Sequence, residues 1–358
     1  MKFLVAAIIL CSLSLEVTGF VESIYQFGDS LNDVGNAILL PTIGPTLPAA
    51  RPPYGESLPG KKPTGRWSDG LLIVDRIAEL LNVPLLPPYL SNPNGPFPNG
   101  VNFAVAGAAA LNFSVLSSQG IRPLFPVPGL QDQIGWFKSY LSTQCSTFTD
   151  CCSYLSSSLF VIGEIGVNDI NSAITSGKTY QEIMEFVPLV VNATLQAIRD
   201  VIALGARKIA VAGNLPIGCQ QFTMLDYNNS AAAGPYDADG CLQNPNKIAT
   251  YLNQLLVSGI FNLTVDFPGV KVVYLNYYDA FQGLVQIPAA FGFDPKTVFQ
   301  PCCGNGVLSD ADVFCGGAEA ALCGDPDEFI SWDGYHLTQA AYSKIAEYLT
   351  LPVLSAAL

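Results

Sequence analysis

Five short apolar segments, rich in β-branched and aromatic residues, most constrain what this chain can fold into. We interpret them as strands, at residues 23–27, 101–106, 159–165, 208–212 and 270–276. Between several of them, apolar side chains recur at every third or fourth position, as over residues 71–81 and 248–256, which is the period of an amphipathic helix. Strands that alternate with helices predict an α/β fold, in which a mostly parallel sheet is covered by helices on both faces.

Residues 1–19 have the pattern of a secretory signal peptide. Lys2 precedes the apolar run of residues 3–10, and small residues follow near Thr18 and Gly19. A buried N-terminal helix is the alternative, but it leaves the coincidence of these features unexplained. The remaining residues, 20–358, contain no charge block, long Ser/Gly run or internal repeat that would mark a linker, so they predict a single domain. Within it, the Pro-rich stretches 41–63 and 84–98 predict long surface loops.

Four N-x-[ST] sequons also fit passage through the secretory pathway, although such a motif arises easily by chance. They begin at Asn112, Asn192, Asn228 and Asn262. No apolar run beyond residue 19 reaches the roughly 18 residues that span a bilayer, so we expect a soluble protein without a stable membrane anchor. The expected location is the extracellular space or the cell wall, with the vacuole as an alternative.

The net charge of the chain argues against two classes of partner. It is −13 at pH 7, with only 16 Lys and Arg residues among 358. Nucleic acids and anionic membranes are bound through basic patches, so neither is expected as a standing partner. The mean hydropathy of +0.35 instead predicts a large apolar interior and an apolar pocket for an acyl chain or an aromatic ester.

The cysteines indicate an oxidising compartment but do not by themselves give a pairing. The chain has 10, and removal of Cys11 with the signal peptide leaves nine. An oxidising compartment allows up to four disulfides, with one thiol left over. Zinc is the rival interpretation, but it requires repeated spacings such as C-x-x-C, which the adjacent pairs at 151–152 and 302–303 do not supply. We therefore expect neither a metal nor another cofactor.

A serine stands where the first strand ends. Residues 23–27 run directly into Gly28-Asp29-Ser30-Leu31, and ligands of parallel sheets bind beyond the carboxyl ends of the strands. A helix that began after Ser30 would also direct its backbone N–H groups, including that of Ser30, toward an anion at this edge. Ser30 is therefore a candidate nucleophile. The alternative is that it only caps a helix.

His336 is the only histidine in the chain. A serine that attacks an ester at neutral pH needs a base, and histidine has the unperturbed pKa suited to that role. Asp333 stands three residues earlier, close enough in a turn to accept a hydrogen bond from the imidazole Nδ1 and leave Nε2 free for Ser30. These residues form a candidate catalytic triad. The alternative is a polar loop before a final helix.

Two further segments offer hydrogen-bond donors at strand ends. Asn168 follows the strand expected at 159–165, and its side-chain amide can donate. Gly107 ends the segment 101–106 with a backbone N–H that a ligand can approach closely. With the N–H of Ser30, these groups predict a three-donor oxyanion hole. Taken singly, each feature could also be an asparagine turn or a glycine that ends a strand.

Together these segments resemble the GDSL esterase/lipase family of the SGNH hydrolase superfamily, and more closely its plant secreted branch. In chain order the matching blocks are Gly28-Asp29-Ser30-Leu31, Gly107, Gly166-Val167-Asn168-Asp169 and Asp333-Gly334-Tyr335-His336. The resemblance covers nearly all of the chain after residue 19. It implies a three-layer αβα sandwich with a flavodoxin-like sheet, and ester hydrolysis without a metal.

The resemblance also implies a role for each matching residue. The catalytic triad is that of Ser30, Asp333 and His336. The oxyanion hole is formed by Ser30, Gly107 and Asn168. By the same resemblance, Asp29 and Asp169 are structural residues that hold their blocks in place.

A carboxylic-ester hydrolase acting on lipid or specialised-metabolite esters is the function that follows. Leu337 stands after the histidine where many relatives carry Pro, an ending that resembles a subgroup acting on specialised-metabolite esters. An acyltransferase that passes the Ser30 acyl group to an alcohol is the near alternative, and an inactive binding protein on the same scaffold is a distant one. Acyl-chain length and oligomeric state are left open. For the disulfides, we expect Cys219 to pair with Cys241, which closes a polar, glycine-rich loop.

Overall fold

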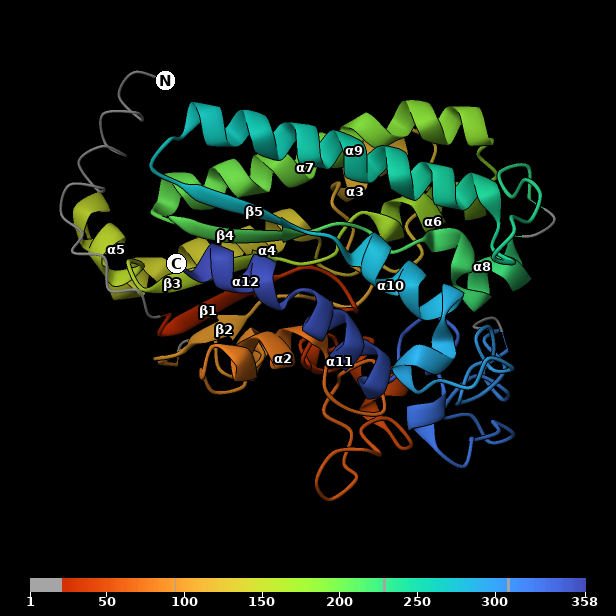
Figure 1. The fold of residues 1–358 in the computed structure, drawn as a ribbon. Coiled ribbons are helices and arrows are strands. Elements are labelled where there is room, and N and C mark those ends of the chain that lie inside the picture. The colour runs from red at the N-terminus through yellow and green to blue at the C-terminus, as the bar shows by residue number, and fades with distance from the viewer. Residues whose placement is uncertain (1–20, 94, 228–229, 308–309) are drawn as a thin grey trace.

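A five-stranded parallel sheet forms the centre of the structure, a computed structural model that describes residues 21–358 except 94, 228–229 and 308–309 (Figure 1). The strands are β1 (Ser23–Phe27), β2 (Gly100–Asn102), β3 (Ser158–Ile162), β4 (Lys208–Ala212) and β5 (Lys271–Leu275). Their order is β2-β1-β3-β4-β5, and every neighbouring pair is parallel. This flavodoxin-like order confirms the expected α/β fold. The signal peptide expected at residues 1–19 and the sequon at Asn228 lie outside the described residues.

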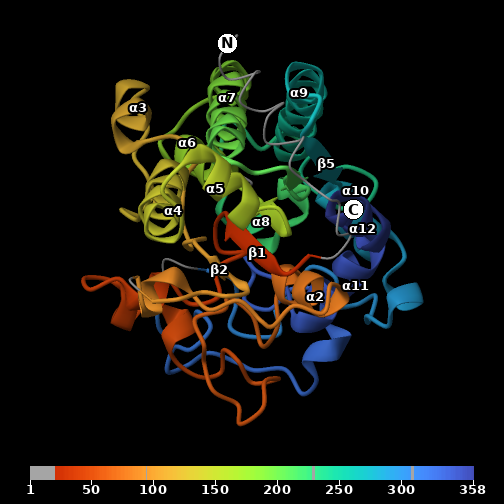
Figure 2. The same ribbon diagram turned by 90° about the vertical axis from the view of Figure 1, so that its left-hand side faces the viewer.

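Helices cover both faces of the sheet, which makes three layers (Figure 2). One face packs on α4 (Leu130–Gln144), α7 (Tyr180–Leu204) and α9 (Gln243–Asp266). The other packs on α2 (Ile73–Leu80), α10 (Tyr277–Gln286), α11 (Gln339–Tyr348) and α12 (Thr350–Ala357). Side chains of β1 alternate between the two cores, with Tyr25 and Phe27 in the first and Ile24 in the second. Because both faces are covered, neighbouring positions within a strand are both apolar, as in Leu159 and Phe160 of β3.

Shorter elements complete the layers and their edges. The remaining α-helices are α3 (Phe113–Ser118), α5 (Phe148–Tyr154), α6 (Val167–Thr175) and α8 (Gln221–Asp226). Short 3-10 turns are Ala37–Leu39, Gly44–Thr46, Pro48–Ala50, Tyr89–Ser91, Ile217–Cys219, Pro288–Phe291 and Pro326–Glu328. In Figure 1 the strands run from left to right, and the described residues of the long segment 292–338 lie beyond their right-hand, carboxyl ends.

Two strands end earlier than the sequence predicts. β2 stops at Asn102 rather than at residue 106, because the Asn102 side chain accepts a hydrogen bond from the Ala104 N–H (2.9 Å) and turns the chain away from the sheet. β3 stops at Ile162 rather than at residue 165. The chain then turns through Gly166, whose left-handed φ of 107° starts helix α6.

Helices α7 and α9 are long and apolar enough to cross a bilayer, judged by length and composition alone. Within their most apolar windows, however, 50% and 44% of the residues are buried in the protein. The two helices pack closely, because a Cβ added to Gly259 of α9 would lie 2.3 Å from Leu195 Cδ1 of α7. They are core helices of one face, and the expected lack of a membrane anchor stays a prediction.

Four disulfides join pairs of described cysteines: Cys145–Cys151, Cys219–Cys241, Cys302–Cys323 and Cys303–Cys315. The second of these is the pair expected from the sequence. The last two cross-link the loop of residues 292–338, which leads to Asp333 and His336. No described cysteine is a free thiol, so the leftover thiol expected from the odd count is not found. Within the described ranges, no cluster of His, Cys, Asp or Glu could hold a metal ion.

Candidate active site

Ser30 lies in a tight turn that follows β1 at the carboxyl edge of the sheet. Gly28 begins the turn with a φ of 145°, and a Cβ on this residue would lie 2.8 Å from Asn32 Nδ2 and 3.1 Å from the Glu164 carbonyl oxygen. The Gly28 N–H donates to Gln133 Oε1 (2.9 Å), and its carbonyl accepts from Gln133 Nε2 (2.8 Å), which ties the turn to helix α4. The geometry of this turn therefore requires a glycine two positions before Ser30.

The helix expected after Ser30 does not form, and the next regular element is the 3-10 turn Ala37–Leu39. The reason is the Asp33 carboxylate, which accepts four backbone hydrogen bonds of 2.6 to 3.0 Å, from Gly35, Asn36, Ala37 and Ala106. A side chain that binds backbone N–H groups in this way replaces the hydrogen bonds of a helix. Asp33 therefore shapes the loop after Ser30 and joins it to the segment before Gly107.

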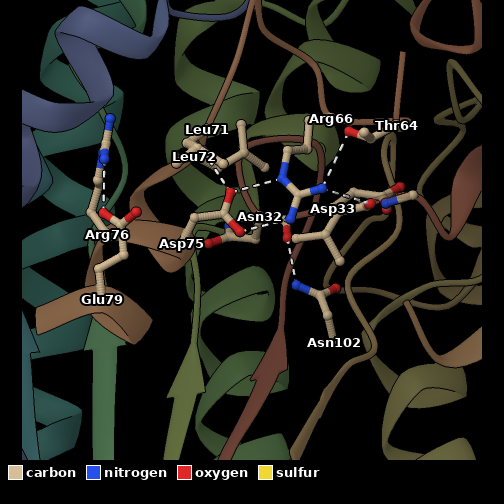
Figure 3. Close-up of polar contacts among 12 residues, drawn as sticks. Asn32, Asp33, Thr64, Arg66, Leu71, Leu72, Asp75, Arg76, Glu79 and Asn102 are labelled. Atoms are coloured by element: carbon tan, nitrogen blue, oxygen red, sulfur yellow. Dashed lines mark hydrogen bonds and ion pairs between the residues drawn. The ribbon is translucent and has the colours of Figure 1, made fainter. Parts of the chain in front are cut away.

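A buried ion pair and an asparagine bridge hold this loop against its neighbours (Figure 3). Arg66 donates to both carboxylate oxygens of Asp75 (2.8 and 2.7 Å), and the side chains are 9% and 1% exposed. Arg66 also donates to the Val34 carbonyl in the loop (3.4 Å). Asn102 Nδ2 donates to the Asn32 carbonyl (2.7 Å), which joins the end of β2 to the same loop.

His336 and Asp333 are joined by a short, buried hydrogen bond. His336 Nδ1 lies 2.7 Å from Asp333 Oδ2, and the side chains are 10% and 0% exposed. The other carboxylate oxygen accepts the backbone N–H groups of Tyr335 (2.9 Å) and His336 (2.8 Å). Burial pushes the Asp333 pKa upward, but His336 and the hydroxyl of Tyr54 hold this pKa below its usual value. An ionised Asp333 selects the tautomer with the proton on Nδ1, which leaves Nε2 as a proton acceptor.

Tyr54 makes a further contact with this pair, and no pattern in the sequence indicates this contact. Its hydroxyl donates to Asp333 Oδ2 (2.7 Å), the oxygen that also faces His336. The residue is 0% exposed, and burial followed by the charge of Asp333 raises the pKa of Tyr54 well above its usual value. Tyr54 lies in the Pro-rich stretch 41–63, which the sequence indicates only as a surface loop. The contact spans 279 positions, so no local pattern reports it.

Two backbone N–H groups are available beside Ser30. Within the described structure, neither the Ser30 N–H nor the Gly107 N–H donates a hydrogen bond. Gly107 has a left-handed φ of 83°, and a Cβ there would lie 2.9 Å from the Phe125 ring. Only glycine fits this position without strain, so the sequence places a bare backbone amide at the site.

Asn168 stands at the start of α6, and both hydrogens of its amide have protein acceptors. Asn168 Nδ2 donates to Asp29 Oδ2 and to the Ala108 carbonyl, each at 3.1 Å. Both distances are at the long end of the N–H···O range. The neighbouring Asp169 accepts the N–H groups of residues 110 and 111 (2.8 and 3.0 Å), which fastens α6 to the segment after Gly107.

These groups meet at one cavity of about 110 Å³. Ser30, Gly107, Asn168 and His336 all line it, whereas Asp333 lies behind the imidazole. The rest of the lining is mostly apolar and includes Ile43, Leu47, Trp67, Phe125, Phe222 and Phe314. In the described structure no hydrogen bond joins the Ser30 hydroxyl to His336, and such bonds are often long or poorly aligned before substrate binds.

Comparison with known proteins gives this arrangement a family. The profile described as GDSL-like Lipase/Acylhydrolase matches residues 24–349. An acetylajmalan esterase from Rauvolfia serpentina is 42% identical over 337 residues, which are 94% of this chain and 86% of that protein. A GDSL esterase/lipase from Arabidopsis thaliana is 38% identical over 331 residues, 92% of this chain and 84% of that protein. This chain belongs to the GDSL lipase/acylhydrolase family.

Membership in the GDSL family confirms the resemblance stated from the sequence. It makes the chain a carboxylic-ester hydrolase with a small-molecule ester as substrate. Every block used for the resemblance borders the cavity beside Ser30 or supports a residue that does. In this GDSL enzyme the nucleophile candidate follows β1 and Asn168 follows β3, so the site lies where the strand order reverses, as in other open α/β sheets.

Three sequons of this GDSL enzyme lie on the described surface. Asn112, Asn192 and Asn262 are all exposed. The second and third lie on helices α7 and α9, and Asn112 precedes α3 at the rim of a separate groove. Their glycosylation stays a prediction.

Proposed function

We propose that this enzyme hydrolyses carboxylic esters through an acyl-enzyme on Ser30. His336 accepts the Ser30 proton as the hydroxyl oxygen attacks the ester carbonyl, and it gives that proton to the departing alcohol. Asp333 orients the imidazole and stabilises its protonated form. A water molecule activated by the same histidine then releases the acyl group as an acid.

One observation carries this proposal. The single histidine of the chain is fixed through Nδ1 by the buried Asp333 (2.7 Å), and it lines the same cavity as Ser30. Its Nε2 makes no hydrogen bond to a described residue, so this nitrogen is available to a hydroxyl or a water in the cavity. A histidine with a purely structural role would more commonly have both ring nitrogens satisfied by the protein.

The unpaired N–H groups of Ser30 and Gly107 support an oxyanion hole, with Asn168 as the third donor. Because both Asn168 hydrogens have acceptors, an oxyanion must share one of them with the Ala108 carbonyl or Asp29. Loss of one such donor typically lowers kcat about 100-fold to 1,000-fold. We expect Asn168→Ala to fall in that range, and a change below about threefold would rule out its donor role.

The names of two relatives support an ester with a short acyl group. The relatives from Rauvolfia serpentina are named for an acetyl ester. We therefore propose a specialised-metabolite ester with a short acyl group as substrate. A series of acetyl, butyryl and palmitoyl p-nitrophenyl esters tests this, with kcat/KM expected to fall as the chain lengthens.

Secretion is part of the same proposal. It rests on the signal-peptide pattern of residues 1–19, the exposed sequons and the disulfides, since disulfides persist in oxidising compartments. Expression of the full chain in plant cells, followed by mass spectrometry of the protein in the medium, should find a mature chain that starts near residue 20 and carries glycans. A chain retained inside the cell with residues 1–19 intact would contradict it.

Labelling with a fluorophosphonate probe tests the nucleophile. Mass spectrometry of the purified protein should find the phosphonyl group on Ser30, with labelling abolished in Ser30→Ala and strongly slowed in His336→Ala. Ser117→Ala, a change at an exposed serine of helix α3, is the matched control and should label as the wild type does. A folded protein that stays unlabelled would refute the proposal.

Added alcohols separate hydrolysis from acyl transfer. In the hydrolase, release of acid should account for all of the alcohol released from the substrate, with or without methanol or a sugar in the assay. A new ester formed in preference to acid would favour the acyltransferase, which uses the same acyl-enzyme. No turnover by a labelled protein, with any acceptor, would favour a binding role.

A further inference from the structure

Glu164 is a buried carboxyl group at the edge of the catalytic cavity. It follows β3, is 1% exposed, and lines the same cavity as Ser30 and Asn168. Among the described residues, neither of its carboxyl oxygens has a hydrogen-bond partner of good geometry. An isolated buried carboxylate is very costly, so the side chain must be neutral or share its charge with a neighbour.

The neighbour is Asp29, which precedes the nucleophile and is 0% exposed. The Asp29 N–H donates to the Glu164 carbonyl (3.3 Å), which brings the two residues together where β1 and β3 end. The Asp29 carboxylate accepts the Leu31 N–H on Oδ1 and the Asn168 amide on Oδ2, each at 3.1 Å. The carboxyl groups of Asp29 and Glu164 also interact directly, since each affects the proton affinity of the other. Two carboxyl groups this close do not both ionise, so they hold one proton between them.

We propose that Glu164 and Asp29 share one proton, and that this singly charged pair positions the Asn168 amide to donate to the oxyanion. Glu164 donates the shared proton to the Asp29 carboxylate, and Asp29 in turn holds Asn168 Nδ2. Glu164 is a positioning residue, because it acts through Asp29 and Asn168. The inference rests on the proposed function, which gives Asn168 its part in the reaction.

The electrostatics of the surroundings agree with a shared proton. Burial, and then the charge of Asp29, raises the pKa of Glu164 well above its usual value, and burial raises the pKa of Asp29 to about 6. The other titratable groups that face the pair are Asp169 of α6, Tyr277 of α10, Tyr342 of α11 and His336. Beyond the effect of burial, the charge of Asp169 raises the pKa of Glu164, whereas the charge of His336 lowers the pKa of Asp29. Within this proposal, we expect the proton to stay with the pair at neutral pH and to leave at alkaline pH.

Loss of that proton should weaken catalysis. A second negative charge beside the Asn168 amide would oppose the charge that develops on the oxyanion. The kcat of the wild type should therefore decline at alkaline pH. Glu164→Gln keeps a neutral group that donates an N–H to Asp29, so this variant should lose the alkaline decline.

A double-mutant cycle tests whether Glu164 acts through Asn168. Glu164→Leu removes the donor, and we expect kcat to fall about tenfold with little change in KM, while Glu164→Gln restores most of the loss. In an Asn168→Ala background, the same Glu164→Leu change should cost less than about twofold, because residues that act as a unit are not additive. A role in stability alone would instead lower kcat by the same factor in both backgrounds.

Asp69→Asn is the matched control. Asp69 is another buried carboxyl whose pKa is raised by burial, and it does not line the cavity. Its replacement should leave the alkaline decline of kcat in place. If Glu164→Leu does not fold, the dependence of kcat on pH in Glu164→Gln tests the shared proton by itself.

Fluorophosphonate labelling distinguishes failure of the shared-proton pair from failure of the proposed acyl-enzyme. Labelling of Ser30 together with the same alkaline decline in wild type and Glu164→Gln would overturn the shared-proton pair and leave the acyl-enzyme standing. Additive losses of kcat in the double-mutant cycle would likewise overturn the shared-proton pair and leave the acyl-enzyme standing. A folded wild type that stays unlabelled would overturn the proposed function, and this inference with it.

Discussion

Replacement of Tyr54 by Phe removes one hydroxyl and tests how the Asp333 carboxylate is held. In the structure this hydroxyl donates to Asp333 Oδ2 (2.7 Å), and His336 Nδ1 lies 2.7 Å from the same oxygen. Tyr54 is fully buried, so bulk water has no direct access to the contact. The change should therefore leave an ionised carboxylate with one hydrogen bond fewer and no ready substitute.

The size of the effect follows from the kind of hydrogen bond that is lost. A hydrogen bond to a charged group contributes about 1.5 to 3 kcal/mol. If the whole loss appeared in the transition state, kcat would fall between about 10-fold and 150-fold, since about 1.4 kcal/mol is a factor of ten. Asp333 keeps its contacts with the His336 imidazole and two backbone N–H groups. We therefore expect the lower end, about a tenfold fall in kcat, with stability reduced by about 1 to 2 kcal/mol.

Steady-state kinetics with a short-chain ester and urea unfolding measure the two effects. Tyr140→Phe is the matched control, because this buried hydroxyl contacts neutral groups: the Tyr154 hydroxyl (2.8 Å), the Phe97 carbonyl (3.4 Å) and Tyr25. It should lose about 1 kcal/mol of stability and keep the wild-type kcat. A Tyr54→Phe protein with wild-type kcat would refute the argument that this hydroxyl supports the proposed triad.

Three further predictions concern the supports of the site. Arg66→Ala should lower the free energy of unfolding by about 3 to 5 kcal/mol in urea, because it leaves the buried Asp75 without its partner; an unchanged midpoint would contradict this. Gly107→Ala should lower kcat by about tenfold or more, because a Cβ strains the left-handed φ of 83° and lies 2.9 Å from the Phe125 ring. Wild-type kcat in a folded variant would exclude the Gly107 N–H as an oxyanion donor. Burial raises the Asp29 pKa from 3.8 to about 6 in the folded state, so the folded protein binds this proton more tightly than the unfolded chain does. The stability that this proton contributes is complete below about pH 4 and is lost as the pH rises through 6, a step that Asp29→Asn should flatten in urea unfolding curves.

Local patterns in the sequence were sufficient for the sheet and for the order of the site residues along it. The bounds expected for β1 and β4 are those of the structure, because these strands are largely buried on both faces and rich in apolar residues. β2 ends early because the Asn102 side chain turns the chain, and β3 ends at Ile162, opposite Phe27, the last residue of β1. Hydrophobic periodicity indicates which residues are buried, but it does not indicate where a side chain forms a hydrogen bond with the backbone and ends a strand.

The parts that could not be predicted depend on contacts between distant segments. The loop after Ser30 replaces the expected helix because Asp33 binds the backbone on both sides of the site, including a residue 73 positions away. The Tyr54 contact with Asp333 joins residues 279 positions apart. Glu164 has an ordinary place in its segment, and only its burial beside Asp29 gives it significance. Sequence patterns indicate the residues of a site more readily than the groups that hold them.

Trapping of the acyl-enzyme identifies the residue that carries the acyl group during turnover. The purified protein is mixed with an activated acetyl ester, quenched in acid within the first turnover, digested and mapped by mass spectrometry. If Ser30 is the nucleophile, we expect one acetyl group on Ser30, formed in a burst and absent from Ser30→Ala. Both the formation and the decay of this acetyl-enzyme should be slower in His336→Ala. Ester turnover by a folded protein in which the acetyl group appears on another residue, or on none while Ser30→Ala keeps full activity, would contradict this role of Ser30.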